Sequence, residues 1–316
     1  MSLEERPREN TSEEQQRTFH FGDAIINKAR GLGHCFCLGL DPHLTLIPGA
    51  FRRGTMVASA PQTIEALEDF LTAVIDLAAG RIVALKPQSA MYERLGSAGI
   101  ALLERVVRYA QSRDILVLLD AKRGDISATA EAYAEAYLMP DSPNPVDAMT
   151  VNPYMGIDTI EPYIQLSVKF GKGVFVVLKT SNPGSGRFQS LRTGKTTVYG
   201  TIAEALRPLS DALCGDSQWS SLGVVVGVTY PEEAAEIRAL LPRALFLFPG
   251  YGYQRGALSQ IRAALVAGPH GLEGAIISSS RDTLFPVISQ TAPFEAWKTS
   301  FDDQLGRHIR GVADIL

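Results

Sequence analysis

The sequence predicts a single-domain α/β protein, a (β/α)8 TIM-type barrel formed by residues 18–316. Eight short runs rich in Val, Ile, Leu and Phe are spaced along the chain, and stretches with helical periodicity lie between them. Near-continuous apolar runs of this length are typical of strands buried on both faces, as in a parallel sheet. Eight strand–helix repeats favour the barrel over a doubly wound open sheet, which usually has fewer strands and a Gly-rich first turn.

The elements of this barrel can be placed by residue number. The predicted strands span residues 35–41, 82–87, 115–120, 148–152, 173–180, 222–229, 244–249 and 274–280. The predicted helices span residues 61–79, 100–110, 128–138, 159–170, 198–213, 231–240, 259–267 and 293–315. Along 61–79, for example, apolar residues recur every three or four positions, which gives a helix one apolar face. Two long connections, 42–60 and 182–197, follow strands and are expected at the mouth of the barrel.

Composition excludes several classes of protein. The formal net charge of -4 argues against a nucleic-acid partner, which usually requires a basic surface. Residues 1–17 are polar and read as a tail without the apolar core of a secretory signal. No apolar stretch is long enough to span a membrane, so no membrane association is expected. Three cysteines, Cys35, Cys37 and Cys214, form no C-x-x-C pair and predict reduced thiols in a cytoplasmic protein.

Charged residues stand where buried strands should end in neutral ones. The strand-end charges are Asp41, Lys86, Asp120, Lys122, Asp125 and Arg281. Because side chains alternate along a strand, Asp120 and Lys122 should share one face, and Leu116 and Leu118 would place that face inside the barrel. A lysine flanked by carboxylates stays protonated and can act as a general acid. The alternative is a structural salt-bridge network, although such networks are costly to bury.

A second group of residues predicts a phosphate site. Residues 249–256 read P-G-Y-G-Y-Q-R-G after the seventh strand, and Gly250 and Gly252 would let backbone N–H groups approach an anion. Arg281 ends the eighth strand, and the loops after strands seven and eight commonly bind phosphate in this fold. The G-K-T at 194–196 is not a P-loop, because Gln189 replaces the required glycine. The five histidines show no metal-ligand spacing, so no metal is expected.

The motifs together resemble one family. D-A-K-R-G-D-I at 120–126 resembles the D-x-K-x-x-D-I signature of orotidine 5'-monophosphate decarboxylases, in the variant of their longer-chain bacterial (type 2) branch. L-G-L-D-P, L-K, K-T-S-N-P-G-S, P-G-Y-G-Y-Q and S-S-S-R match at strands one, two, five, seven and eight, in that order. The resemblance implies a (β/α)8 barrel and a cofactor-free lyase of pyrimidine biosynthesis that converts orotidine 5'-monophosphate (OMP) to UMP and CO2.

The resemblance also implies roles for individual residues. Lys122 would protonate C6 after CO2 leaves, and Asp120 would lie beside the departing carboxylate. Lys86 and Asp41 would contact the ribose. The remaining residues implied in substrate binding are Asp125 and Thr129 from the second subunit of a homodimer, Ser181 at the pyrimidine, and Gly250, Gly252, Gln254 and Arg281 at the phosphate. Lys179 and His43 lie near the expected mouth and receive no role.

Three other functions stay open on the sequence. A metal-dependent keto-sugar-phosphate decarboxylase on the same scaffold shares the D-x-K motif. A Schiff-base aldolase could use Lys86 or Lys179. A non-catalytic phosphate-binding barrel would bind nucleotide without turnover. The complete row of charges and the Asp125 that follows Gly124 favour the nucleotide decarboxylase.

Overall fold

The computed structural model describes residues 19–227, 231–251, 258–288 and 290–316, and its centre is the predicted closed barrel of eight parallel strands. The barrel strands are β1 (Phe36–Leu40), β2 (Ala84–Pro87), β3 (Leu116–Arg123), β4 (Ala148–Val151), β5 (Gly173–Lys179), β8 (Leu222–Val226), β9 (Leu245–Pro249) and β12 (Ala275–Ser279). The sheet closes where β1 pairs in parallel with β12. All eight predicted strands are therefore confirmed, with ends that differ by a few residues; the predicted positions 228 and 229 lie outside the described residues.

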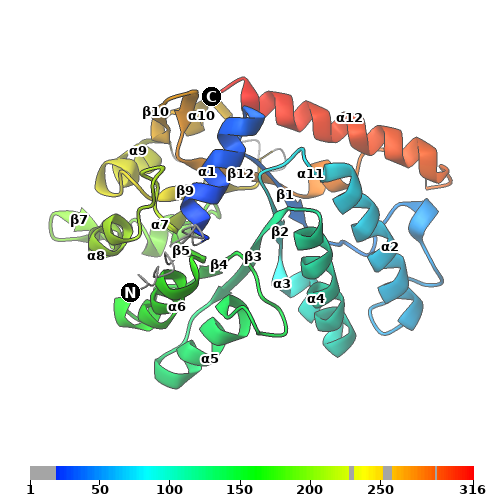
Figure 1. Ribbon diagram of the computed structural model, residues 1–316, viewed down its shortest axis with the longest axis horizontal. Helices are drawn as coiled ribbons and strands as arrows, with labels where there is room; N and C mark the ends of the chain where they lie inside the picture. The colour runs from blue at the N-terminus through cyan, green and yellow to red at the C-terminus, as the bar shows by residue number, and fades with distance from the viewer. Residues whose placement is uncertain (1–18, 228–230, 252–257, 289) are drawn as a thin grey trace, which may run out of the picture.

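Helices surround the barrel and connect its strands (Figure 1). The longer ones are α2 (Pro61–Ala78), α4 (Gly96–Ser112), α5 (Ser127–Leu138), α6 (Glu161–Phe170), α8 (Val198–Ala212), α9 (Pro231–Leu240) and α12 (Phe294–Ala313). Their apolar faces pack on the outside of the barrel and form one large buried cluster with the outward-facing strand residues. This outer layer follows the helices predicted from periodicity.

One predicted helix is wrong over much of its length. Residues 259–267 were expected to form a single helix, but the chain makes α10 (Leu258–Ile261), a 3-10 turn (Arg262–Ala264) and then β10 (Val266–Gly268). β10 pairs antiparallel with β11 (Gly271–Glu273). Gly268, Pro269 and Gly271 favour a tight turn over continued helix, and the hairpin satisfies backbone groups that the helix would have satisfied.

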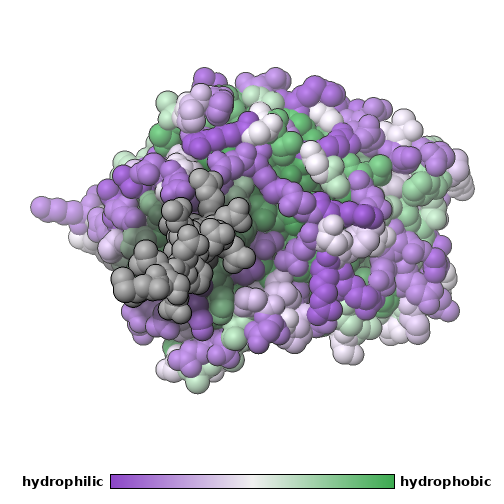
Figure 2. All heavy atoms as spheres, viewed as in Figure 1, coloured by the Kyte–Doolittle hydropathy of each residue, from purple (hydrophilic) through white to green (hydrophobic). Residues whose placement is uncertain are grey.

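A helix that precedes the barrel was not predicted. α1 (Phe21–Leu32) lies across one end of the barrel (Figure 1). Phe21, Ile25 and Ile26 are buried in a second apolar cluster, which also contains Leu116 and Leu118 from inside the barrel. The Phe21 ring meets Phe175 edge to face at 5.9 Å. α1 therefore closes the end of the barrel opposite the carboxyl ends of the strands. The solvent-facing surface on the side of α1 is mostly hydrophilic (Figure 2).

The two long connections contain short elements of their own. Residues 42–60 include a 3-10 turn (Gly49–Phe51), and residues 182–197 contain α7 (Ser185–Phe188) and the hairpin of β6 (Arg192–Thr193) and β7 (Thr196–Thr197). We call residues 182–197 the mouth loop. A short helix, α3 (Ser89–Glu93), follows β2, and α11 (Arg281–Leu284) follows β12. In the described part of the chain, no helix is long and apolar enough to cross a membrane.

Candidate active site

A cavity of about 330 Å³ opens at the carboxyl ends of the barrel strands. Among the residues that the structure describes, five of the eight barrel strands contribute to its lining, and β4, β5 and β8 do not. The lining residues are Asp41, His43, Lys86, Gln88, Met91, Asp120, Lys122, Pro249, Gly250, Tyr251, Ser278, Ser280 and Arg281. These residues follow or end β1, β2, β3, β9 and β12, whose parallel arrangement brings their carboxyl ends together. The cavity is therefore the candidate active site.

Three charged side chains form a compact array on one wall of this cavity. Asp120, 6% exposed, accepts a hydrogen bond from Lys86 Nζ at 3.0 Å through Oδ2. Its other oxygen, Oδ1, accepts from Lys122 Nζ and from the Thr150 hydroxyl, the latter at 3.0 Å. Lys86 is 4% exposed, whereas the Lys122 side chain is 41% exposed and faces the open cavity. One buried carboxylate thus holds two ammonium groups, both of which line the cavity, and Lys122 is the more exposed of the two.

The array fixes the ionisation of its buried members. Burial would raise the pKa of Asp120, but the charges of Lys86 and Lys122 and their hydrogen bonds outweigh it and lower the pKa well below its usual range. Burial would likewise lower the pKa of Lys86, and the carboxylates of Asp120 and Asp41 reverse this and raise it. Lys86 therefore stays a cation at neutral pH and cannot act as the free amine that a Schiff base requires.

The end of β3 is irregular in a way that shapes the array. Its pairing with β4 shifts register between Leu119 and Arg123, and Lys122 has a positive φ of 47°. Thr150 on β4 stabilises this bend, because its hydroxyl oxygen accepts hydrogen bonds from the backbone N–H groups of Ala121 and Lys122 at 3.0 and 2.9 Å. Sequence reasoning missed Thr150. The only available signal was a threonine inside an otherwise apolar strand.

The part of the lining that follows β1, β9 and β12 carries the groups predicted to bind phosphate and ribose. Gly250 and Arg281 line the cavity, as does Asp41, whose buried Oδ1 has no hydrogen-bond partner among the described residues. His43 also lines the cavity, and burial together with the charge of Arg281 lowers the pKa of its imidazole. Ser278, Ser280 and Tyr251 complete this part of the lining. Ser278 and Ser280 belong to the S-S-S-R motif, from which the sequence predicts no role for either.

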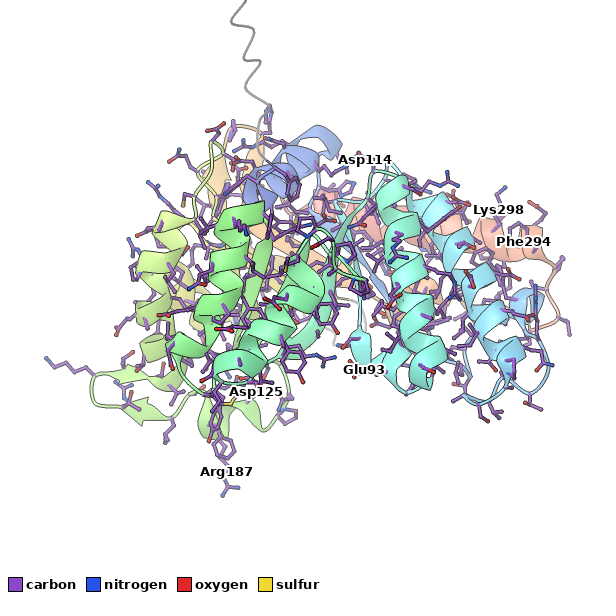
Figure 3. All side chains as sticks on the ribbon, turned by 60° about the horizontal axis from the view of Figure 1, so that its bottom comes forward. Glu93, Asp114, Asp125, Arg187, Phe294 and Lys298 are labelled. Atoms are coloured by element: carbon purple, nitrogen blue, oxygen red, sulfur yellow. The ribbon has the colours of Figure 1, made fainter. Side chains whose placement is uncertain are left out.

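Other predicted site residues lie elsewhere. Asp125 and Thr129 do not line the cavity; Asp125 Oδ1 accepts a hydrogen bond from the neighbouring Ile126 N–H at 2.8 Å, and Thr129 is exposed. Figure 3 shows Asp125 and Arg187 at one edge of the molecule and Asp114, which precedes β3, near the opposite edge. Ser181 does not line the cavity either. The predicted positions Gly252 and Gln254 lie outside the described residues.

Comparison with known proteins gives one consistent family. The profile of the orotidine 5'-phosphate decarboxylase / HUMPS family matches residues 35–281. An orotidine 5'-phosphate decarboxylase from Rhodopirellula baltica is 38% identical over 80% of this chain and 84% of its own length, and one from Clostridium acetobutylicum is 36% identical over 83% and 88%. The structure of Leishmania donovani OMP decarboxylase superposes with a TM-score of 0.71 at 29% identity, covering 94% of this chain and 98% of its own. The chain therefore belongs to the orotidine 5'-phosphate decarboxylase / HUMPS family.

Proposed function

We propose that this protein is an orotidine 5'-phosphate decarboxylase, a carboxy-lyase that converts OMP to UMP and CO2. The observation that carries the proposal is the Lys86–Asp120–Lys122 array at the wall of the mouth cavity, with Lys122 as its accessible cation. Asp120 and Lys122 of the array belong to the family signature at 120–126. The relatives that are 36–38% identical carry the same activity in their names, which favours the nucleotide over a keto-sugar phosphate.

The proposed reaction needs no electron-accepting cofactor. The bond between C6 and the carboxylate breaks, CO2 leaves, and the electron pair stays on C6. A cation placed in advance stabilises this charge, because it needs no reorganisation during the reaction. The Lys122 ammonium is that cation, and it then transfers a proton from Nζ to C6 and is reprotonated by solvent. Asp120 orients Lys122 and lies where the substrate carboxylate departs.

The phosphate would lie where the chain leaves β9 and β12. Arg281 and the backbone at Gly250, with Gly252 and Gln254 from the adjoining segment, are the proposed phosphate ligands. Asp41 and Lys86 would hold the ribose, and Ser181 would contact the pyrimidine when substrate is present. Binding energy from the distant phosphate can then be used to align C6 with Lys122.

A homodimer with shared sites is part of the proposal. Asp125 and Thr129 of each subunit would complete the neighbour's site, since neither lines the cavity of its own chain. Apolar side chains are exposed around them: Ile126 is 56% exposed and Tyr154 is 90% exposed. Exposed apolar residues that cluster at a polar functional edge are typical of a subunit interface. A cytoplasmic location is proposed from the three free cysteines.

A comparison of two substrates tests the proposed function. Purified protein is incubated with OMP in the presence of EDTA. A separate sample is incubated with the phosphate of a 3-keto sugar acid in the presence of Mg²⁺, and CO2 release is measured in both. We expect CO2 release from OMP and none from the sugar phosphate. Release only from the sugar phosphate with Mg²⁺ would establish the alternative member of the same family. Tight binding of UMP without CO2 release from either substrate would indicate a non-catalytic barrel.

A further inference from the structure

Lys179 is a charged residue whose burial the proposed chemistry does not explain. It is the last residue of β5, and its side chain is only 1% exposed. Lysines are almost never buried so completely unless they are paired. Lys179 is also absent from the lining of the mouth cavity, so it does not serve as the amine of a Schiff-base mechanism. Its charge must therefore act on something other than the reacting atoms.

The strand turns Lys179 away from the barrel interior. Phe175 and Val177 lie in or against the inner apolar cluster, and strict alternation would point Lys179 the same way. The pairing of β5 with β8, however, shifts register between Val177 and Lys179. Such an irregularity redirects a side chain, and here the ammonium reaches α7 and α9 instead of the cavity.

The contacts of Lys179 and its partner Glu233 hold both ends of α7. The Lys179 Nζ donates to Ser185 Oγ, at the start of α7, at 3.0 Å, and lies 3.2 Å from Oε2 of Glu233 in the first turn of α9. The other carboxylate oxygen, Oε1 of Glu233, accepts a hydrogen bond from Ser190 Oγ at 2.8 Å, just beyond the end of α7. Gln189 strengthens this attachment, because its Oε1 accepts from Thr180 N–H at 2.8 Å.

Beyond the ion pair, hydrogen bonds to Thr180 and to the start of α8 attach the mouth loop, and few apolar contacts do. Within it the Phe188 side chain is 71% exposed and Leu191 is 57% exposed, so apolar burial contributes little to its position. A buried ion pair is a poor source of net stability, but it specifies one arrangement, because any other arrangement leaves a charge unpaired. The loop begins directly after Ser181, whose backbone packs against Gly227 at the end of β8.

We propose that Lys179 and Glu233 are positioning residues for the reaction, whose buried ion pair fixes α7 and therefore the mouth loop beside the pyrimidine end of the site. The inference rests on the proposed function and deepens it. The pair touches no reacting atom, so it acts on substrate binding through the loop and leaves the proton transfer from Lys122 unchanged.

The test uses Lys179→Met and Glu233→Gln in the full-length protein, with Lys172→Met as the matched control. Lys172 precedes the opposite end of β5, and its Nζ lies 3.6 Å from Asp147 Oδ1. Steady-state kinetics with OMP and hydrogen–deuterium exchange of peptides covering 182–197 are measured for each. We expect KM to rise about tenfold or more in both loop variants while kcat changes less than about threefold, and exchange at 182–197 to accelerate. Lys172→Met should match the parent in both measurements.

Each other outcome is decisive. Folded variants with parental KM and parental exchange at 182–197 would overturn the proposal, as would a fall in kcat with unchanged KM. If Lys179→Met does not fold, Glu233→Gln decides, because Glu233 is partly exposed and its amide leaves the size of the side chain unchanged. A parent that does not act on OMP would refute the proposed function, while the exchange measurement would still test the ion pair.

Discussion

Asp120 is the residue on which the geometry of the site depends most directly, because one carboxylate accepts hydrogen bonds from Lys86, Lys122 and Thr150. Replacing it with asparagine removes the charge and leaves Lys86 buried without its partner. Breaking a buried pair in this way typically costs about 3–5 kcal/mol. We expect Asp120→Asn to lower the free energy of unfolding by about 3 kcal/mol in urea at pH 7 and to reduce kcat sharply. Unchanged stability would mean that the array is not coupled as its distances indicate.

The stability difference between the parent and Asp120→Asn depends on pH because the pKa values of Asp120 and Lys86 are both shifted in the folded protein. The lowered pKa of Asp120 gives stability that is complete above its unfolded value, near pH 3.9, and is lost as pH falls toward the folded value. The raised pKa of Lys86 gives stability that is complete below its unfolded value, about 10.4, and is lost as pH rises through the folded value. The free energy of unfolding of the parent should therefore exceed that of Asp120→Asn by a constant amount from about pH 6 to 8, and by less below about pH 4. Urea unfolding at each pH measures it.

The positions of site residues were predictable from the sequence where side chains alternate along a strand and where a charged residue ends a buried strand. Leu116 and Leu118 lie in the inner apolar cluster, and Asp120 and Lys122 continue their face into the cavity, as expected. The bend that gives Lys122 its positive φ was not predictable, because the hydroxyl that stabilises it comes from Thr150 on another strand. A contact between two residues that are 28 positions apart in the sequence leaves no local pattern there.

At the scale of elements, prediction succeeded where packing requires a repeated pattern. Strands buried on both faces and helices with one apolar face left clear signals over many residues. α1 was overlooked because it stands outside the strand–helix repeat, although Phe21, Ile25 and Ile26 have the spacing of a buried helix face. The segment 259–267 was predicted wrongly because its apolar residues have the spacing of a helix. Gly268, Pro269 and Gly271, which follow it, favour the turn of the β10–β11 hairpin instead.

One element-scale prediction concerns the attachment of α9 to the barrel. Arg238 on α9 is 7% exposed, and its guanidinium donates to the carbonyls of Ala244, Ala264 and Gly274 at 2.6, 2.8 and 2.9 Å. It also lies 3.7 Å over the Phe246 ring. Arg238→Met would leave buried carbonyls unpaired, at about 1–3 kcal/mol for each such group.

The effect of Arg238→Met should be confined to stability. Ala244 and Gly274 precede β9 and β12, at the end of the barrel opposite the mouth. We expect the free energy of unfolding to fall by about 3–5 kcal/mol, measured in urea, with KM for OMP unchanged in the remaining folded protein. A change in KM without a change in stability would contradict this structural role.

At the scale of the whole molecule, the proposal places each site between two subunits of a homodimer. Subunits carrying Lys122→Ala and subunits carrying Asp125→Ala should each be inactive alone. If Asp125 completes the neighbour's site, a hybrid dimer contains one site with both substitutions and one intact site. Equal mixing should then restore about a quarter of the parental activity per subunit. No recovery, with subunit exchange verified by mass spectrometry, would show that each subunit uses its own Asp125.

The barrel as a whole brings charges from distant parts of the sequence into one cavity, and the central claim is that one of them, Lys122, supplies the cation and the proton. The most direct test follows the loss of OMP absorbance in EDTA with the parent and with Lys122→Ala. We predict rapid loss with the parent and a kcat at least about 10⁴-fold lower in a folded variant. Turnover within about tenfold of the parent in Lys122→Ala would contradict the account, since general acid catalysis and charge stabilisation together contribute far more.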